Sequence, residues 1–381
     1  MRKIDLFALV GLVILVSCSE RKTFEQDFLL DISDRKKFFL GKGGLTSEPF
    51  YYVSLDSTRS KGVIYNRLAH SLDSLFVSPD SAWIKEGDIM EIDGPYGVGS
   101  LFSFFATKDH LIFMNSQQFF NQNRETKEVS MKFMNGYGIF GDTPYLMVSV
   151  PTAKSSHEFY GLDKNSGVGY FVFDDDRQVR VFGYSPSLDS MFFAPVVLDS
   201  QSYFKLRFKV TSGNLILGGN DAPQISIVGS NMIVTYPSFS DFLVHDLRSQ
   251  DQKIYSSKSV AYASARVLPQ NYSNEVSSGE LQFELEKAMS AQVRYGYMDY
   301  LESVDKYIRL VKGEGGANSH FFLEVFDGNF QKLNEIDLSE INPDLSGEYV
   351  NTTHGLMFRA QDQPEEDVMY YYYINLIKGN N

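Results

Sequence analysis

The sequence predicts an all-β protein, and three observations lead to this fold class. Tyrosine and phenylalanine are abundant, with 23 and 31 copies, whereas tryptophan occurs once. Short runs that alternate aromatic or β-branched residues with polar ones recur along the chain, as strands with one half-buried face require. Clusters of Asp, Asn, Gly and Ser separate the runs. These residues suit tight turns because they tolerate positive φ or bond to their own backbone.

The clearest of the expected strands follow one another with no proline-rich or glycine-rich linker between them, which favours a single folded domain. They are predicted at residues 50–53, 61–65, 111–114, 145–150, 169–173, 178–182, 204–210, 232–236, 307–311, 321–326 and 369–374.

Three hairpin-like units share a template of strand, polar turn and strand. They pair residues 170–173 with 179–182, 244–247 with 252–255, and 323–327 with 330–333. Repeats of about 40–50 residues that each hold a few strands are typical of β-propeller blades. The chain length then predicts a β-propeller of about six to seven blades. A pair of β-sandwiches is the alternative, because the repeats are too degenerate to align.

One segment has helical periodicity instead. Ser277 and Glu280 have the spacing of a capping box, in which each side chain bonds to the backbone N–H of the other residue. Apolar residues then recur at helical spacing, at Leu281, Leu285, Ala288, Met289 and Val293. These features predict one amphipathic helix from Gly279 to about Gln292, inserted between strands.

The N-terminus has the pattern of an export signal. Arg2 and Lys3 precede the apolar run Leu6–Val16, and the small residue Ser17 follows it. The run is about half of the roughly twenty residues that a membrane-spanning helix needs. It therefore predicts a signal peptide rather than a transmembrane segment.

The sequence Leu-Val-Ser-Cys that ends at Cys18 resembles the lipobox of bacterial lipoproteins, in which the cysteine becomes the lipid-modified first residue. An ordinary signal peptide is the alternative. We expect a lipoprotein signal peptide at 1–17, a lipidated N-terminus and short tether at 18–23, and the β-propeller domain at 24–381. The lipoprotein would sit in the cell envelope, in the outer membrane facing the periplasm, or alternatively at the cell surface.

The charge and the cysteine content exclude several kinds of function. Removing residues 1–17 takes away Arg2, Lys3 and Asp5, which changes the formal charge from −13 to −14. An acidic surface repels phosphate backbones, so we expect no nucleic-acid partner. Cys18 is the only cysteine, and once it is lipidated no thiol remains for a disulfide, a zinc site or a nucleophile.

The glycine and acidic motifs in the chain do not predict a cofactor or metal site. Residues 136–141 spell G-x-G-x-x-G, but a strand-like segment follows where a dinucleotide site needs a helix. Residues 313–316 lack the strand–loop–helix arrangement and the Lys-Ser/Thr ending of a P-loop. Asp174, Asp175 and Asp176 are followed by no acidic residue at a calcium-loop spacing, so we interpret them as a solvated turn.

The six histidines also lack a local ligand or catalytic pattern. They are His70, His110, His157, His245, His320 and His354, and no two of them have metal-ligand spacing. No G-x-S-x-G nucleophile elbow occurs. We therefore predict no catalytic residues, no cofactor and no metal.

Four serines lie in Asp-Ser-x triplets that resemble O-glycosylation sites of exported Bacteroidetes-type proteins. Ordinary turn chemistry explains the same triplets. The candidate glycan acceptors are Ser57, Ser74, Ser81 and Ser190.

Several short segments resemble one protein family. Asp305-Lys306-Tyr307-Ile308-Arg309 stands where the family has Asp-Pro-Tyr-Arg-x-Tyr-Tyr-Arg. The others are residues 323–330, Gly355-Leu356-Met357 and the acidic-Gly-Pro turn at 91–97. With the lipobox, they resemble the domain-of-unknown-function 4221 family of Bacteroidetes-type β-propeller lipoproteins. The resemblance implies a fold and a location, and it implies no chemistry.

The leading functional hypothesis is a non-catalytic binding or scaffolding module for a protein, peptide or glycan. The alternative is a propeller hydrolase or lyase that acts on a glycan or lactone. The binding or scaffolding hypothesis is favoured because the sequence contains no catalytic motif. A role in nutrient capture or envelope sensing is a third possibility. The predicted helix at 279–292 and the Gly94-Pro95-Tyr96 turn are the first candidates for partner contacts.

Overall fold

The computed structural model describes residues 28–40, 53–56, 58–66, 69–91, 97–98, 103–114, 118–133, 146–147, 161–174, 178–200, 208–212, 215–219, 222–269, 275–276 and 279–378. This part of the chain consists mainly of strands, which confirms the all-β prediction. Its α-helices are α3 (Gly279–Ser290), where the sequence predicted a helix, and the short α4 (Leu338–Ile341). Neither helix is long and apolar enough to cross a membrane.

A nine-stranded sheet joins the two ends of the chain. One side of it, here the N-terminal arm, comprises β3 (Val53–Leu55), β4 (Lys61–Asn66), β5 (Ser71–Val77) and β6 (Ser81–Ile89). The other side, here the C-terminal arm, comprises β27 (Leu345–Thr352), β28 (Gly355–Ala360), β29 (Val368–Lys378) and β1 (Phe28–Ile32). Strand β2 (Lys36–Phe39) lies between the arms, parallel to β6 and antiparallel to β29.

Four antiparallel sheets lie between these arms in chain order. The first is β7 (Ser103–Ala106), β8 (His110–Met114), β9 (Gln118–Asn123) and β10 (Val129–Phe133). The second is β11 (Leu146–Met147), β12 (Gly161–Asp163), β13 (Val168–Asp174), β14 (Val179–Ser185) and β15 (Ser190–Phe193). The third is β18 (Gln224–Val228), β19 (Asn231–Tyr236), β20 (Phe239–Asp246) and β21 (Gln252–Tyr255). The fourth is β23 (Arg294–Leu301), β24 (Lys306–Lys312), β25 (Phe321–Phe326) and β26 (Lys332–Asp337).

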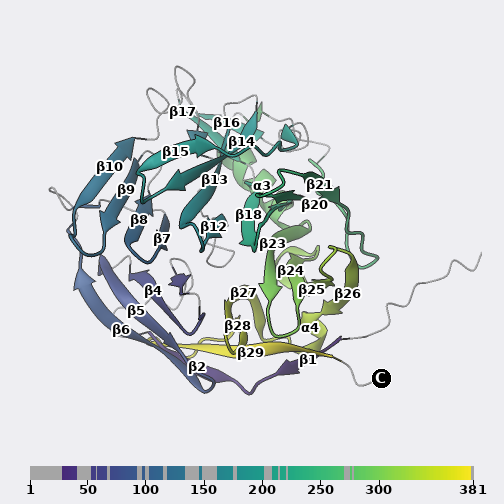
Figure 1. Cartoon of the computed structure of the whole chain (residues 1–381). Coiled ribbons are helices and arrows are strands. Elements are labelled where there is room, and N and C mark those ends of the chain that lie inside the picture. The colour runs from purple at the N-terminus through teal and green to yellow at the C-terminus, as the bar shows by residue number, and fades with distance from the viewer. Residues whose placement is uncertain are drawn as a thin grey trace, which may run out of the picture.

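A small three-stranded sheet accompanies α3. It contains β16 (Phe208–Ser212), β17 (Leu215–Gly219) and β22 (Glu275–Val276), and β22 is parallel to β16. In Figure 1 it lies at the periphery, beside β14 and α3.

The three predicted hairpins are present as β13–β14, β20–β21 and β25–β26. The polar turns of β20–β21 and β25–β26 are held by side chains that bond to the turn backbone. Asp246 Oδ1 accepts the N–H groups of Arg248 and Ser249, and Asp327 Oδ1 accepts those of Asn329 and Gln331. These bonds replace the ladder bonds that a turn interrupts.

Six apolar clusters of the described core each join two neighbouring sheets or the two arms of the nine-stranded sheet. One cluster joins the N-terminal arm to β7–β9, and the next joins β7–β9 to β13–β14. Others join β13–β14 to β18–β20, β19–β20 to β23–β25, and β23–β25 to the C-terminal arm. A sixth joins the two arms to each other. The sheets therefore follow one another in a closed ring, as Figure 1 shows.

Candidate functional site

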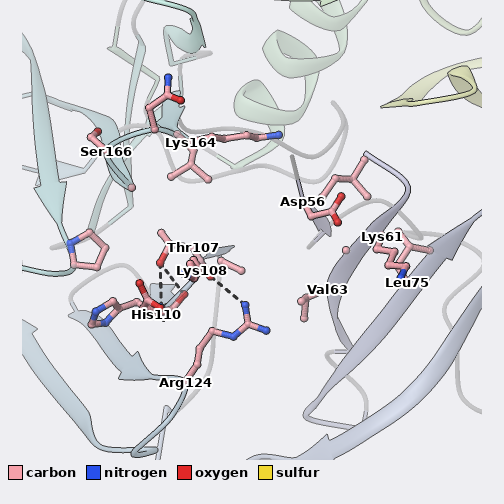
Figure 2. A pocket seen from close by; sticks show the side chains of 18 of the residues that line it. Asp56, Lys61, Val63, Leu75, Thr107, Lys108, His110, Arg124, Lys164 and Ser166 are labelled. Atoms are coloured by element: carbon pink, nitrogen blue, oxygen red, sulfur yellow. Dashed lines mark hydrogen bonds between the residues drawn. The ribbon is translucent and has the colours of Figure 1, made fainter. Parts of the chain in front are cut away.

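A pocket of about 730 Å³ lies where turns from three neighbouring parts of the ring converge. The turn after β3 contributes Asp56, the turn after β7 contributes Thr107 to Asp109, and the turn after β12 contributes Lys164 to Gly167. Strands β7 and β12 are near the centre of the ring in Figure 1. Figure 2 shows side chains from all three turns around one open space.

Local hydrogen bonds fix the shape of these turns. Asp163 Oδ1 accepts the N–H of Asn165 at 3.0 Å, and its Oδ2 accepts the Ser166 hydroxyl at 2.6 Å. Gly167 has φ of 71°, a conformation that favours glycine and closes the turn into β13. Thr107 Oγ1 accepts the N–H of His110 at 3.0 Å. The pocket rim is thus made of short, internally bonded turns.

Four of the residues that line the pocket are cationic, namely Lys61, Lys108, Arg124 and Lys164, and two are acidic, Asp56 and Asp109. We call this the basic pocket. Its excess of positive charge contrasts with the formal charge of −13 for the chain. Because charges of one sign in a cleft concentrate the electric field there, the basic pocket attracts anions in spite of the acidic chain.

The guanidinium of Arg124 is held in place beside the cavity. Its Nη1 donates to the Thr107 carbonyl oxygen at 3.1 Å, and its backbone N–H donates to the Asp109 carbonyl at 2.9 Å. Figure 2 shows the guanidinium directed into the open space from one side and Lys164 extending over it from another. A guanidinium retains donors after one bond and can therefore bind an additional carboxylate or sulfate.

Two of the lysines are available for an added anion. Within the described part of the chain, the amino groups of Lys61 and Lys108 have no hydrogen-bond or ion-pair partner. Asp56, by contrast, is engaged in its own turn, where Oδ1 accepts the N–H of Thr58 at 3.1 Å and its hydroxyl at 2.7 Å.

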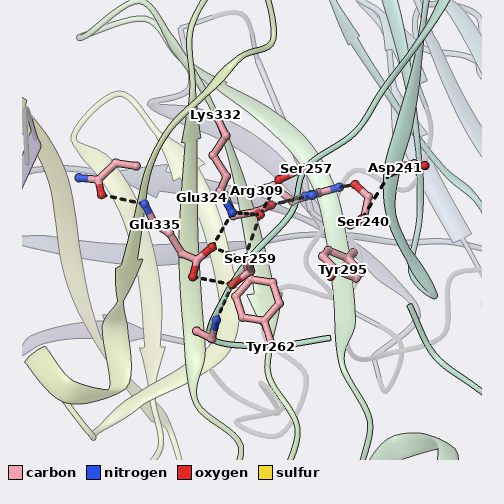
Figure 3. Close-up of polar contacts among 12 residues, drawn as sticks. Ser240, Asp241, Ser257, Ser259, Tyr262, Tyr295, Arg309, Glu324, Lys332 and Glu335 are labelled. Carbon is pink, nitrogen blue, oxygen red and sulfur yellow. Dashed lines mark hydrogen bonds and ion pairs between the residues drawn. The ribbon is translucent and has the colours of Figure 1, made fainter. Parts of the chain in front are cut away.

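A second cluster of charges is largely buried and lies between the third and fourth antiparallel sheets (Figure 3). Arg309 and Glu324 are opposite each other on β24 and β25, and both are 0% exposed. Arg309 Nε donates to Glu324 Oε2 at 2.7 Å, and Nη2 lies 2.7 Å from the same oxygen. Lys332 and Glu335 on β26 complete what we call the buried charge cluster.

The buried charge cluster is neutral in sum and well bonded. Glu324 Oε1 accepts from Ser257 Oγ at 2.8 Å, Tyr262 OH at 2.9 Å and Lys332 Nζ at 3.1 Å. Burial alone would raise the pKa of Glu324, but the charges of Arg309 and Lys332 lower it, so the carboxylate is ionised. Burial and the adjacent carboxylates raise the pKa of Tyr262. With its groups bonded to one another, the cluster is a structural element that ties the segment after β21 to β24–β26.

The residues predicted as modification sites do not lie together. Cys18 and Ser57 fall outside the described residues, as do the boundaries at 17 and 23. Ser74 is exposed on β5 and lines the basic pocket, whereas Ser81 begins β6 and Ser190 begins β15. A glycan on Ser74 would therefore compete with any ligand for the pocket.

Most of the described histidines have structural partners. His70 Nδ1 lies 2.7 Å from Tyr65 OH, His110 Nδ1 lies 2.8 Å from Asn121 Oδ1, and His320 Nδ1 lies 2.7 Å from Asp337 Oδ2. His245 is fully buried and neither ring nitrogen has a hydrogen-bond partner. Among the described residues, no three histidine, cysteine, aspartate or glutamate side chains could together hold a metal ion. His157 lies outside them.

The other motifs of the sequence lie apart from the pocket or outside the described residues. Residues 136–141, Gly94-Pro95-Tyr96, Asp175 and Asp176 fall outside. Residues 313–316 leave β24 and enter a 3-10 turn at Gly316–Asn318, so they do not open a long helix. The basic pocket was not predicted from the sequence. Its only signal was one or two charged residues in each of several polar turns, which are common in any all-β chain.

Comparison with protein families found a match. The family model of the domain of unknown function DUF4221 covers residues 80–337. Comparison with curated proteins produced no match.

Comparison with solved structures found similar folds in Bacteroides proteins. A DUF4221 family member from Bacteroides vulgatus aligns with a TM-score of 0.67 and 11% identity over 93% of this chain and 99% of its own. A Bacteroides fragilis protein described as exported aligns with a TM-score of 0.53 and 12% identity over 92% and 96%. An auxiliary nutrient binding protein from Bacteroides ovatus aligns with a TM-score of 0.42 and 8% identity over 92% and 77%. At these identities, the first two alignments show similarity of fold alone.

Proposed function

The chain belongs to the DUF4221 family, a domain family of unknown function, and we propose that it is a lipid-anchored, extracytoplasmic binding module. The module binds its ligand at the basic pocket and does not transform it. The ligand is a protein, peptide or glycan, and nucleic acid is not a partner.

We propose that the ring of sheets is a β-propeller of six blades, with the N-terminal and C-terminal arms as the first and last. The cycle of six apolar clusters supports this architecture, since each blade of a propeller packs only on its two neighbours. The pairing of β1 and β2 with β29 would close it. In a pair of β-sandwiches, the alternative, the sheets would pack in two separate couples.

The proposed location depends on Cys18 and on the fold. The lipobox-like sequence would place a lipid on Cys18 and hold residues 24–381 as one domain outside the cytoplasm. A protein of similar fold is described as exported, which supports this side of the membrane. We propose the outer membrane facing the periplasm, with the cell surface as the alternative.

The basic pocket is the observation that carries the binding function. It is concave, it is built on rigid turns from separate sheets, and it concentrates positive charge in an acidic chain. Ligand sites in proteins commonly combine these properties. The hydrolase or lyase alternative needs a positioned acid and base. In the pocket, Asp56 is bonded within its turn and His110 to Asn121, which favours binding over catalysis.

Retention on ligand arrays tests this proposal. The mature chain is applied to arrays of peptides and oligosaccharides beside a variant with Lys108→Ser and Lys164→Ser. We expect the wild-type chain to be retained on one class and to leave it chemically unchanged, and the variant to lose retention because the pocket loses two of its cations.

Two results would contradict the proposal. Equal retention of wild type and variant would place binding elsewhere on the molecule. Conversion of the retained ligand to product would instead support the hydrolase or lyase alternative.

The modifications are tested separately, by the intact mass of the protein exported from its native cells. We propose lipid on Cys18 and glycan on at least one of Ser57, Ser74, Ser81 and Ser190. A mass equal to that of the lipidated polypeptide alone would overturn the glycan, and the mass of the bare chain would overturn both.

A further inference from the structure

A row of aromatic residues, two of them exposed, begins at one wall of the basic pocket. Phe76 on β5 is directly opposite Trp83 on β6, and Trp83 is directly opposite Phe39 on β2. The rings of Phe76 and Trp83 are nearly parallel, with centroids 5.4 Å apart and 11° between their planes. Trp83 is 41% exposed and Phe39 is 48% exposed. We call Phe76, Trp83 and Phe39 the aromatic row.

The aromatic row and the basic pocket form one continuous surface. Phe76 lines the pocket, and so does Lys61, its direct neighbour on β4. From the pocket outward, adjacent strands therefore present a cation, then Phe76, then Trp83. Two strand spacings separate Lys61 from Trp83, a distance of about 10 Å.

Cross-strand pairing explains part of this arrangement, because aromatic pairs stabilise neighbouring strands. It does not explain why two large rings stay exposed beside a cationic cavity. Exposed aromatic surface next to a pocket with charged groups is the pattern expected of a ligand site.

The aromatic and cationic groups of the combined surface indicate which class of ligand it binds. Flat aromatic faces pack on the apolar C–H faces of pyranose rings, while lysine and arginine bind carboxylate or sulfate groups. We propose that the basic pocket and the aromatic row bind an acidic oligosaccharide, with its anionic groups at Lys108, Arg124 and Lys164 and a sugar ring on Trp83. This inference rests on the proposed binding function and assigns its ligand class.

An acidic peptide is the competing occupant. Extended peptides commonly bind by adding a strand to an unpaired sheet edge. Strand β6 offers no such edge over the segment that carries Trp83, because it pairs with β5 on one side and with β2 on the other. At the aromatic row, the geometry thus favours a ligand that stacks on side chains over one that adds a strand.

Trp83 supplies a direct probe of binding, since it is the only tryptophan in the chain. The mature protein is titrated with a defined oligogalacturonate, with a sulfated heparin oligosaccharide, and with the uncharged methyl ester of the oligogalacturonate. We expect one or both acidic ligands to change the tryptophan emission in a saturable manner that weakens with added salt. The methyl ester should have little effect.

Variants separate the two parts of the surface, with affinity measured by calorimetry because one variant lacks tryptophan. We expect Trp83→Ala and the Lys108→Ser, Lys164→Ser double variant each to weaken binding about tenfold or more. Phe193→Ala is the matched control, since Phe193 is also an exposed ring, 42% exposed, but lies on β15. It should bind as wild type does.

The outcomes distinguish this inference from the function on which it rests. Absence of binding to either acidic oligosaccharide, with pocket-dependent retention of a peptide, would overturn the ligand class and leave the binding function standing. Equal affinity for the methyl ester, or undiminished affinity after Trp83→Ala, would also overturn the inference.

Discussion

The side chain of Arg309 carries a full positive charge and has no exposed surface. Only the neighbouring protein groups can therefore stabilise that charge. Glu324 pairs with its guanidinium, Nη1 donates to the Ser240 carbonyl at 2.8 Å, and the ring of Tyr295 lies 4.7 Å away. Removing either member of such a pair leaves an uncompensated charge in the interior, which is more costly than the net gain from forming the pair.

We therefore expect Arg309→Met and Glu324→Gln each to lower the free energy of unfolding by about 3–5 kcal/mol, as measured by denaturant titration. Lys36→Met is the control, because its partner Asp80 is 91% exposed, and it should change stability by less than about 1 kcal/mol. A loss of that small size at Arg309 would mean that the buried charge cluster is not formed.

The burial of His245 should make the free energy of unfolding depend on pH. It is buried, and burial lowers its pKa from the ordinary value of 6.5, although the charge of Asp246 and the side chain of Gln250 oppose the shift. The unfolded chain then binds a proton at a higher pH than the folded chain. The contribution of His245 to stability is complete above about pH 6.5 and decreases as the pH falls below that value.

Unfolding measured between pH 7.5 and 5 tests this expectation. The wild-type chain should lose more stability on acidification than His245→Leu, because leucine takes no proton. Identical pH profiles for the two proteins would exclude His245 as the source.

Some of these residues could be recognised in the sequence, but their roles could not be predicted from it. Arg309 was recognisable as a charge in an otherwise apolar strand, and as the last residue of the family-like segment. Its partner Glu324 lies on the next strand, 15 positions away, and Lys332 and Tyr262 approach only when the sheets assemble. Polar residues that satisfy one another across sheets have no local signature.

Single elements were predictable where the signal was local. The hairpins β13–β14, β20–β21 and β25–β26 follow from alternating residues and turn chemistry, and α3 follows from the capping-box spacing and helical periodicity of its sequence. The pairing of β1 and β2 with β29 was not predictable, since it joins residues more than 300 positions apart.

The role of β1 as the outer strand of the C-terminal arm is testable at Phe28. Phe28 is 5% exposed and packs in the cluster that joins β23–β25 to the C-terminal arm. We expect Phe28→Ala to lower the free energy of unfolding by about 3–5 kcal/mol and to speed amide exchange in β29. Leu29→Ala, one residue along the same strand, is the control, because Leu29 is 48% exposed. Equal effects of the two changes would argue that β1 does not pack as described.

In the whole molecule, turns that are far apart in the sequence lie side by side in the ring and together form the basic pocket. The turns after β3, β7 and β12 are each unremarkable in sequence, and they meet because successive sheets pack side by side around the ring. Composition predicted an acidic chain and no nucleic-acid partner, but it could not reveal a local excess of positive charge. That excess exists only in the assembled fold.

The proposed function depends on the binding of an anionic ligand at the basic pocket. A crystal structure of the mature protein with a bound acidic oligosaccharide tests it most directly. We expect anionic groups within hydrogen-bond distance of at least two of Lys108, Arg124 and Lys164, with a sugar ring against Trp83. A ligand bound at α3 or at another face of the ring, with the basic pocket empty, would contradict it.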